Sequence, residues 1–196
     1  MIELTLLTGW AGTLSLLGLV ATGYGMLART VWDPAQLQLL AGALFGALAL
    51  ALMAMPVRVA EGVNLDPRNV PVALAAAFLG LRGGAVALLM AIGMRLSIGG
   101  AGTGAGIAAL LFSAIAGFCW TQGTRPAERT ARDYAWLGVL VGMALWPAVL
   151  LPVPAAAAVL ARAVPLVLVC LIFTMAIAML LDRAALASDP RRHAES

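Results

Sequence analysis

The chain has 196 residues, of which 63% are hydrophobic and only 11% are charged, and its mean hydropathy is +1.00. Soluble domains carry about 25% charged residues, so this composition excludes an ordinary soluble domain and indicates an integral membrane protein. The net charge of +3 comes from twelve arginines without any lysine. Positive loops on a membrane protein explain this charge without a nucleic-acid partner.

Residue types that carry catalysis or bind metals are scarce in the apolar part of the chain. The single histidine, His193, lies in the polar tail, while Cys119 and Cys170 lie in apolar runs where a packing role is expected. No hydrophobic segment holds a pair of carboxylates. These absences argue against haem ligation, a zinc site and a Ser-His or Cys-His nucleophile. We therefore expect no metal, no cofactor and no enzymatic activity.

Apolar segments separated by short polar breaks follow one another along the chain. The first segment lacks a basic N-terminal region and, at about 39 Å as a helix, is long enough to cross a bilayer, so we interpret it as a retained helix. The whole pattern predicts an all-α polytopic membrane bundle with six to seven helical segments. They cover residues 2–27, 35–55, 70–80, 84–98, 104–120, 135–151 and 155–181.

The stretch NLDPRNVPVALAAAFLGLRGG, residues 64–84, interrupts this pattern. Its apolar run 70–80 is about 16 Å long as a helix, too short to cross a bilayer, and it ends in Gly-Leu-Arg-Gly-Gly. Residues 70–98 form either one broken span or a short-helix hairpin that turns at Gly80–Gly84. We favour the hairpin, because interrupted helices in membrane proteins line cavities, and we expect its turn at mid-membrane depth.

The positions of the arginines predict an orientation. The positive-inside rule places the loop of residues 121–134 and the C-terminal tail in the cytoplasm, and the glycine-rich loop 99–104 then lies outside. With a hairpin, the N-terminus and residues 64–68 also lie outside, whereas with a single span they lie inside. The arginines that set this orientation are Arg125, Arg129 and Arg132 in the loop and Arg183, Arg191 and Arg192 in the tail.

Two arginines stand at the open end of the predicted hairpin. An arginine at membrane depth costs at least about 2.5 kcal/mol, so Arg95 either faces a cavity or extends its side chain to the interface. Arg68 either contacts a ligand or pairs with a nearby acid. Together with the helix dipole and the N–H groups of the glycine loop, the two arginines predict a small-anion site. Its predicted members are Arg68, Arg95, Asn64, Asp66, Gly99 and Gly100.

The run NLDPRNVPVALAAAFLGLRGGAVALLMAIGMRLSIGGAGTGAG resembles the core of the LytS-type five-transmembrane sensor domain (5TMR-LYT) of bacterial histidine kinases and diguanylate cyclases. That family carries an Asn/Asp-x-Arg motif, a short helix opening with Val-Pro, a glycine-rich hinge and a second helix ending in Arg-Leu-x-x-Gly-Gly. Asp-Pro-Arg stands here where Asn-x-Arg is common. The matching residues are Asp66-Pro67-Arg68, Val70-Pro71, Gly80 to Gly84, Arg95-Leu96 and Gly99-Gly100.

The resemblance implies a signal-input domain of the bacterial inner membrane, with Arg68 and Arg95 as anion contacts. Some members of the family recognise small, pyruvate-like carboxylates, so we expect this domain to bind a small anionic ligand on the extracytoplasmic side and to relay occupancy through its last helix. Because only fifteen residues follow Leu181, we expect output through a further domain or a partner protein. Besides the lipid bilayer, we expect a homodimer and no nucleic-acid partner.

An alternative function comes from a second similarity. The same stretch is similar to the substrate-capture components of energy-coupling-factor importers, which share the short helix, hinge and glycine loop. The final helix, with Pro165 as a possible hinge and a charged end, favours sensing. The expected organisation is an extra N-terminal helix and loop over residues 1–34, the sensor domain over 35–183 and a cytoplasmic polar tail over 184–196.

Overall fold

The structure is a computed structural model of the 196-residue chain. The beginning of the first predicted helix, the segment that contains Pro165, and the polar tail lie outside the residues that it describes, as does Asp66. The described residues are 15, 18–31, 33–54, 57–60, 63–65, 67–144, 168 and 170–183.

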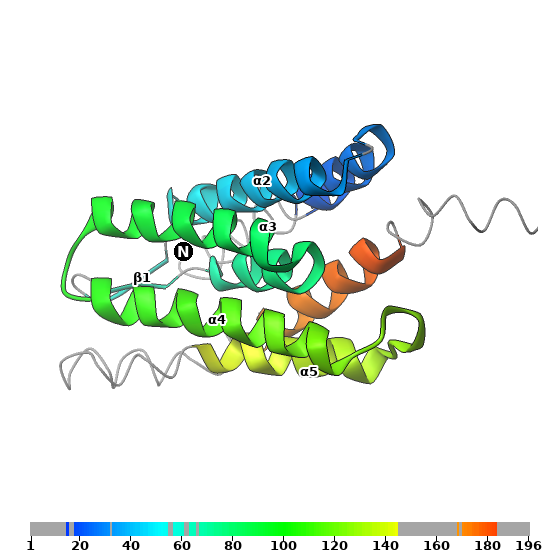
Figure 1. Ribbon diagram of the computed structural model, residues 1–196. Helices are drawn as coiled ribbons and strands as arrows, with labels where there is room; N and C mark the ends of the chain where they lie inside the picture. Colours follow the sequence, from blue (N-terminus) through cyan, green and yellow to red (C-terminus); the bar gives the residue numbers. More distant parts are fainter. Residues whose placement is uncertain are drawn as a thin grey trace, which may run out of the picture.

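Helices form the bundle, as the sequence predicts (Figure 1). A helix over residues 18–30 precedes α2 (Pro34–Ala54), and a helix over residues 170–183, which we call the last helix, closes the described chain. Between them α3 packs against both α2 and α4, and α5 follows a short 3-10 helix. The bounds of these elements are Asn69–Ile98 for α3, Thr103–Gly123 for α4, Pro126–Glu128 for the 3-10 helix and Ala131–Gly142 for α5.

A small β-hairpin lies where the sequence predicts only a loop. Strands β1 (Val57–Ala60) and β2 (Val63–Leu65) pair antiparallel just before α3, with Arg58 opposite Asn64. The alternation of valine with polar residues in VRVAEGVNL fits such strands. The all-α class is unchanged, since this hairpin is the only sheet among the described residues.

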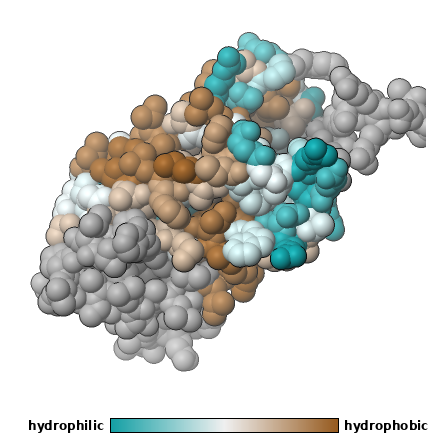
Figure 2. All heavy atoms as spheres, turned by 60° about the horizontal axis from the view of Figure 1, so that its bottom comes forward, coloured by the Kyte–Doolittle hydropathy of each residue, from teal (hydrophilic) through white to brown (hydrophobic). Residues whose placement is uncertain are grey.

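Three of the described helices, α2, α3 and α4, are long and apolar enough to cross a membrane. Large hydrophobic side chains such as Leu89 and Ile115 point outward, as expected for a surface in contact with lipid. Figure 2 shows a broad hydrophobic surface on one face, with hydrophilic residues gathered at the end that holds the α4–α5 loop. The protein is therefore a membrane protein.

The element α3 is a hairpin of two helices rather than one span. Gly80 interrupts it with φ 69° and ψ −162°, a conformation that is essentially restricted to glycine. A Cβ atom on Gly84 would lie 2.8 Å from the Cα atom of Ala76. In a continuous helix these two residues would be about 12 Å apart, so the chain reverses at Gly80. The predicted hairpin is confirmed.

The turn differs from the prediction in the number of glycines that form it. Only Gly80 has the unusual backbone, whereas Gly83 and Gly84 are helical, and their small size is needed because other chain segments touch them. The turn lies beside the end of α4, since the Thr121 hydroxyl near that end donates to the Ala77 carbonyl at 2.5 Å.

The first half of the hairpin, residues 69–79, is the central helix of the bundle. All residues from 69 to 77 are buried, and Figure 1 shows this segment enclosed by its neighbours. Small side chains allow the close approach, since a Cβ atom on Gly117 of α4 would collide with the carbonyl oxygen of Ala73. In the same way, a Cβ atom placed on Gly42 of α2 would lie 2.6 Å from the carbonyl oxygen of Gly83.

Candidate functional site

The hairpin brings two distant arginines together. Arg68 directly precedes α3, and Arg95 lies in its last turn. In one continuous helix they would be separated by about 40 Å. In the folded chain a Cβ atom placed on Gly106 of α4 would lie 2.7 Å from the Nε atom of Arg95 and 2.8 Å from an Nη atom of Arg68. The two guanidinium groups are therefore neighbours against the same residue of α4.

Both arginine side chains lie inside the protein. Arg68 is 8% exposed and Arg95 is 4% exposed, so Arg95 does not extend to the membrane interface, which was one of the two interpretations from the sequence. Gly106 leaves the space that both side chains occupy beside α4. We call Arg68, Arg95 and Gly106 the arginine pair site.

The arginine pair site rests on an apolar floor. Three fully buried residues of one hydrophobic cluster lie one helical turn from the members of the site. They are Val72 after Arg68, Ala91 before Arg95 and Leu110 after Gly106. Water-poor surroundings strengthen the attraction between a guanidinium group and an anion. The two forked groups offer paired donors with the spacing of carboxylate oxygens. The arrangement is therefore suited to holding a small anion.

The other residues predicted for the anion site are two glycines at the end of α3 and two polar residues before it. Gly99 and Gly100 have φ of 66° and 93°, which ends α3 and turns the chain toward α4. The N–H group of Gly99 donates to the Arg95 carbonyl at 3.1 Å, so it is already occupied. Asn64 lies in β2, and its side chain is outside the described part of the structure, as is Asp66.

Asn69 is a neighbour of the site that the sequence analysis missed. It begins α3 directly after Arg68 and is 7% exposed. Its Oδ1 atom is buried and accepts no hydrogen bond among the described residues. Position alone gave no reason to prefer it over Asn64, since both flank the Asp-Pro-Arg motif.

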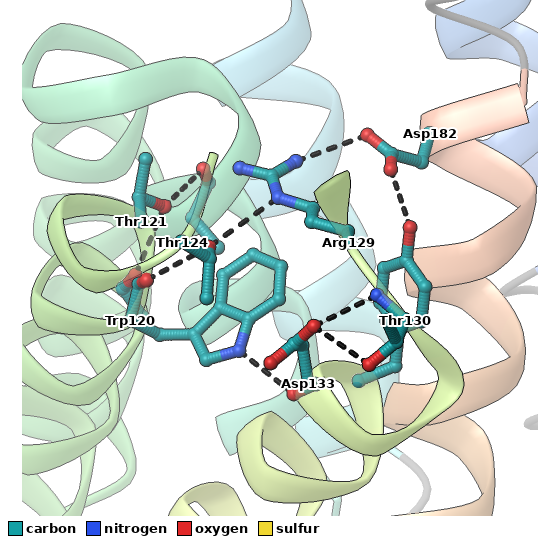
Figure 3. Close-up of polar contacts among 10 residues, drawn as sticks. Trp120, Thr121, Thr124, Arg129, Thr130, Asp133 and Asp182 are labelled. Carbon is teal, nitrogen blue, oxygen red and sulfur yellow. Dashed lines mark hydrogen bonds and ion pairs between the residues drawn. The ribbon is translucent and has the colours of Figure 1, made fainter. Parts of the chain in front are cut away.

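A second polar cluster lies at the other end of the bundle, beside the turn of the hairpin (Figure 3). The Nη1 atom of Arg129 is 3.0 Å from the Oδ1 atom of Asp182, and the Tyr134 hydroxyl donates to the other carboxylate oxygen. The Arg129 guanidinium also lies over the rings of Trp120, at 4.6 Å, and Phe78, at 5.4 Å. We call these five residues the hinge-end cluster.

The hinge-end cluster joins segments that are far apart in sequence. Phe78 belongs to the central helix, Trp120 to α4, Tyr134 to α5 and Asp182 to the last helix. The side chains of Arg129 and Asp182 are 4% and 10% exposed, so the pair is withdrawn from water. Sequence analysis placed Arg129 in a cytoplasmic loop, and the only available signal for the pair was the single acid at the end of the last apolar segment.

The loop beside the cluster is fixed by a capping box. The Asp133 carboxylate accepts from the Thr130 N–H at 2.7 Å and from its hydroxyl at 2.9 Å. The Thr130 N–H first, and its hydroxyl second, lower the pKa of Asp133. The Trp120 indole N–H donates to the Asp133 carbonyl at 2.8 Å, which ties α4 to the start of α5. Arg129 is thus held between two fixed helix ends.

Comparison with known proteins identifies a family. The family model described as the 5TMR of 5TMR-LYT matches residues 23–184, which is most of the chain and includes both polar sites. No curated protein and no solved structure matches the chain significantly.

Proposed function

We propose that the chain, which belongs to the 5TMR-LYT family, is a membrane sensor input domain that binds a small carboxylate. The observation that carries the ligand class is the convergence of Arg68 and Arg95 against Gly106. A pyruvate-like carboxylate fits two forked donors above an apolar floor.

The proposal includes a direction across the membrane. Arg82, Arg125, Arg132 and Arg183 are exposed, and three of them flank the hinge-end cluster while Arg82 follows the turn. The positive-inside rule then puts that end in the cytoplasm of a bacterial inner membrane and the arginine pair site on the extracytoplasmic side. Ligand occupancy is passed through the last helix to a histidine-kinase or diguanylate-cyclase output, in a further domain or a partner, with a homodimer as the working assembly. The chain itself performs no catalysis.

The test of ligand binding is calorimetry on the purified protein in detergent. Pyruvate is the probe, with lactate, acetate and inorganic phosphate titrated alongside it. Arg68→Ala and Arg95→Ala should each weaken binding by about 1.5–3 kcal/mol, because each removes a charge-assisted hydrogen bond. This corresponds to a roughly 10- to 150-fold higher Kd. Unchanged affinity in folded variants would show that the arginine pair does not bind the anion.

The matched control is Arg125→Ala. The Arg125 side chain is 83% exposed and lies 3.6 Å from Glu128, so its removal should leave affinity and folding unchanged. Arg129 is unsuitable as a control, because it is buried in the hinge-end cluster. Binding of a vitamin, with no binding of any carboxylate, would support a capture component of an importer instead of a sensor.

A further inference from the structure

The hinge-end cluster connects the central helix to the last helix, at the end opposite to the arginine pair site. Arg68 directly precedes the central helix, and Phe78 stands at its far end, one residue before its last. The helix between them is about 16 Å long and is buried along almost its whole length. A shift of this helix at Arg68 therefore displaces Phe78 as well, since a packed helix moves as a rigid unit.

Arg129 is the residue on which such a shift acts. Its guanidinium plane is in contact range of Phe78 on one element and Trp120 on another, while its Nη1 atom holds Asp182. Trp120 is fixed by its bond to the Asp133 carbonyl. When Phe78 moves relative to the fixed Trp120 ring, the most favourable position of the Arg129 guanidinium changes. The Asp182 carboxylate moves with the guanidinium that it pairs with.

The ion pair of Arg129 and Asp182 responds to such a shift in steps rather than gradually. Separating two buried charges leaves each without compensation, which is strongly unfavourable. Tyr134 on α5 holds the second carboxylate oxygen, so Asp182 changes partners only when this hydrogen bond also rearranges. An arrangement with a penalty for every intermediate position has two discrete states, which is what transmission between distant sites requires.

We infer that Arg129 is a positioning residue that couples the central helix to the last helix through Asp182. Its role as a signal relay rests on the proposed function, but the mechanical coupling itself does not. Two arms of one experiment separate these two claims. The first arm uses no ligand, and the second uses pyruvate.

The ligand-free arm is a double-mutant cycle on the full chain in detergent. Hydrogen exchange over residues 170–183 is measured for Phe78→Ala, Arg129→Gln and the double variant. Each single change should speed exchange in the last helix about tenfold, which is about 1.4 kcal/mol of opening free energy. The double variant should be no faster than Arg129→Gln alone, since Phe78 acts through Arg129. Additive effects, or no effect of Phe78→Ala, would overturn the inference.

The controls match each change in chemistry. Phe118→Ala removes a partly exposed phenyl ring from α4. Arg125→Gln removes an exposed guanidinium from the α4–α5 loop, which also holds Arg129. Both changes should leave exchange in the last helix unchanged. If Arg129→Gln does not fold, Arg129→Lys replaces it, because it keeps the charge but loses the planar contact with the rings. Arg129→Lys should speed exchange in the last helix about as much as Phe78→Ala does, and slow, wild-type exchange in this variant would mean that the ring contact carries no coupling.

The ligand arm measures exchange in the last helix with and without saturating pyruvate. In the wild-type chain pyruvate should change exchange there, whereas in Arg129→Gln it should bind with an affinity within about threefold of wild type and leave exchange unchanged. If the wild-type chain binds no pyruvate, the proposed function fails and the ligand-free arm still decides the coupling. If pyruvate alters the last helix equally in both chains, the coupling runs elsewhere and the inference is wrong.

Discussion

Gly106→Ala is the sharpest test of the arginine pair site, because it adds one methyl group at the point where both guanidinium groups meet. The new Cβ atom would lie 2.7 Å from the Arg95 Nε atom and 2.8 Å from an Arg68 Nη atom, whereas ordinary contacts begin at 3.4 Å. Each group must therefore retreat by about 0.6–0.7 Å. Arg68 meets the methyl group with its flexible far end, but Arg95 meets it with its Nε and Cδ atoms and must move as a whole.

The expected effect on affinity differs from the effect on stability. If the displacement costs one charge-assisted hydrogen bond to the ligand, affinity falls by about 1.5–3 kcal/mol, or roughly 10- to 150-fold. Stability should fall by at most about 2.5 kcal/mol, because alanine is favoured over glycine in a helix by about 0.5–1 kcal/mol, which offsets part of an overpacking cost of about 1–3 kcal/mol. Weak binding in a protein that is still folded at the assay temperature is the signature of a perturbed site.

The assay is calorimetric titration with pyruvate, alongside thermal unfolding of the same samples in detergent. Gly104→Ala is the matched control, since it lies on the same helix, is exposed and has no atom within 4 Å of its added Cβ. It should bind like the wild-type protein. If Gly106→Ala also binds like the wild type, the ligand does not depend on the geometry of the arginine pair and the site has been assigned wrongly.

Three further predictions concern the turn, the topology and the capping box. The double change Gly83→Val with Gly84→Val should abolish pyruvate binding in calorimetry, because the added side chains collide with α2 and with the first half of the hairpin; undiminished affinity would contradict the packing described for α3. Val63→Cys should react with a membrane-impermeant thiol reagent in intact cells, whereas labelling only after lysis would place the β-hairpin in the cytoplasm. Asp133→Asn should lower the melting temperature at neutral pH. Since the capping box lowers the pKa of Asp133, its stabilisation is present above the ordinary carboxyl pKa of about 4 and is lost as pH falls through the lowered pKa, so the difference from wild type should shrink in acid; a constant difference across pH would exclude the ionised cap.

The hairpin was predictable because its evidence is local. A run of eleven residues cannot cross a bilayer, and proline and glycine mark its two ends. The choice among the three glycines of the hinge was not predictable, since nothing in the pattern says which of them adopts φ 69°. Neighbours in space decide that: Gly83 must fit against α2 and Gly84 against the first half, so both remain helical and Gly80 makes the turn.

The arginine pair site could be predicted from the sequence, whereas the hinge-end cluster could not. Arg68 and Arg95 stand out because charges are rare in apolar helices, and a hairpin necessarily places its two ends near each other. Arg129 and Asp182 are separated by 53 positions and lie at segment ends, where charged residues are usually in water. The packing of α5 against the last helix, which is close enough for Gly138 to meet the backbone of Leu171, removes them from water together with the rings of Phe78 and Trp120.

The unequal lengths of the two halves set the depth of the arginine pair site. Gly84 lies against Ala76, four residues on either side of Gly80, so pairing the halves outward puts Arg68 level with residue 92. Arg68 therefore begins about one turn below Arg95 and about 9 Å short of the end of α3. Its guanidinium reaches Gly106 only by extending back toward the open end of the hairpin. The proposed anion site thus lies below the open end of the hairpin, beside the helix whose other end carries Phe78. A short helix with an arginine at one end and a phenyl ring at the other is the most direct physical connection between the arginine pair site and the last helix.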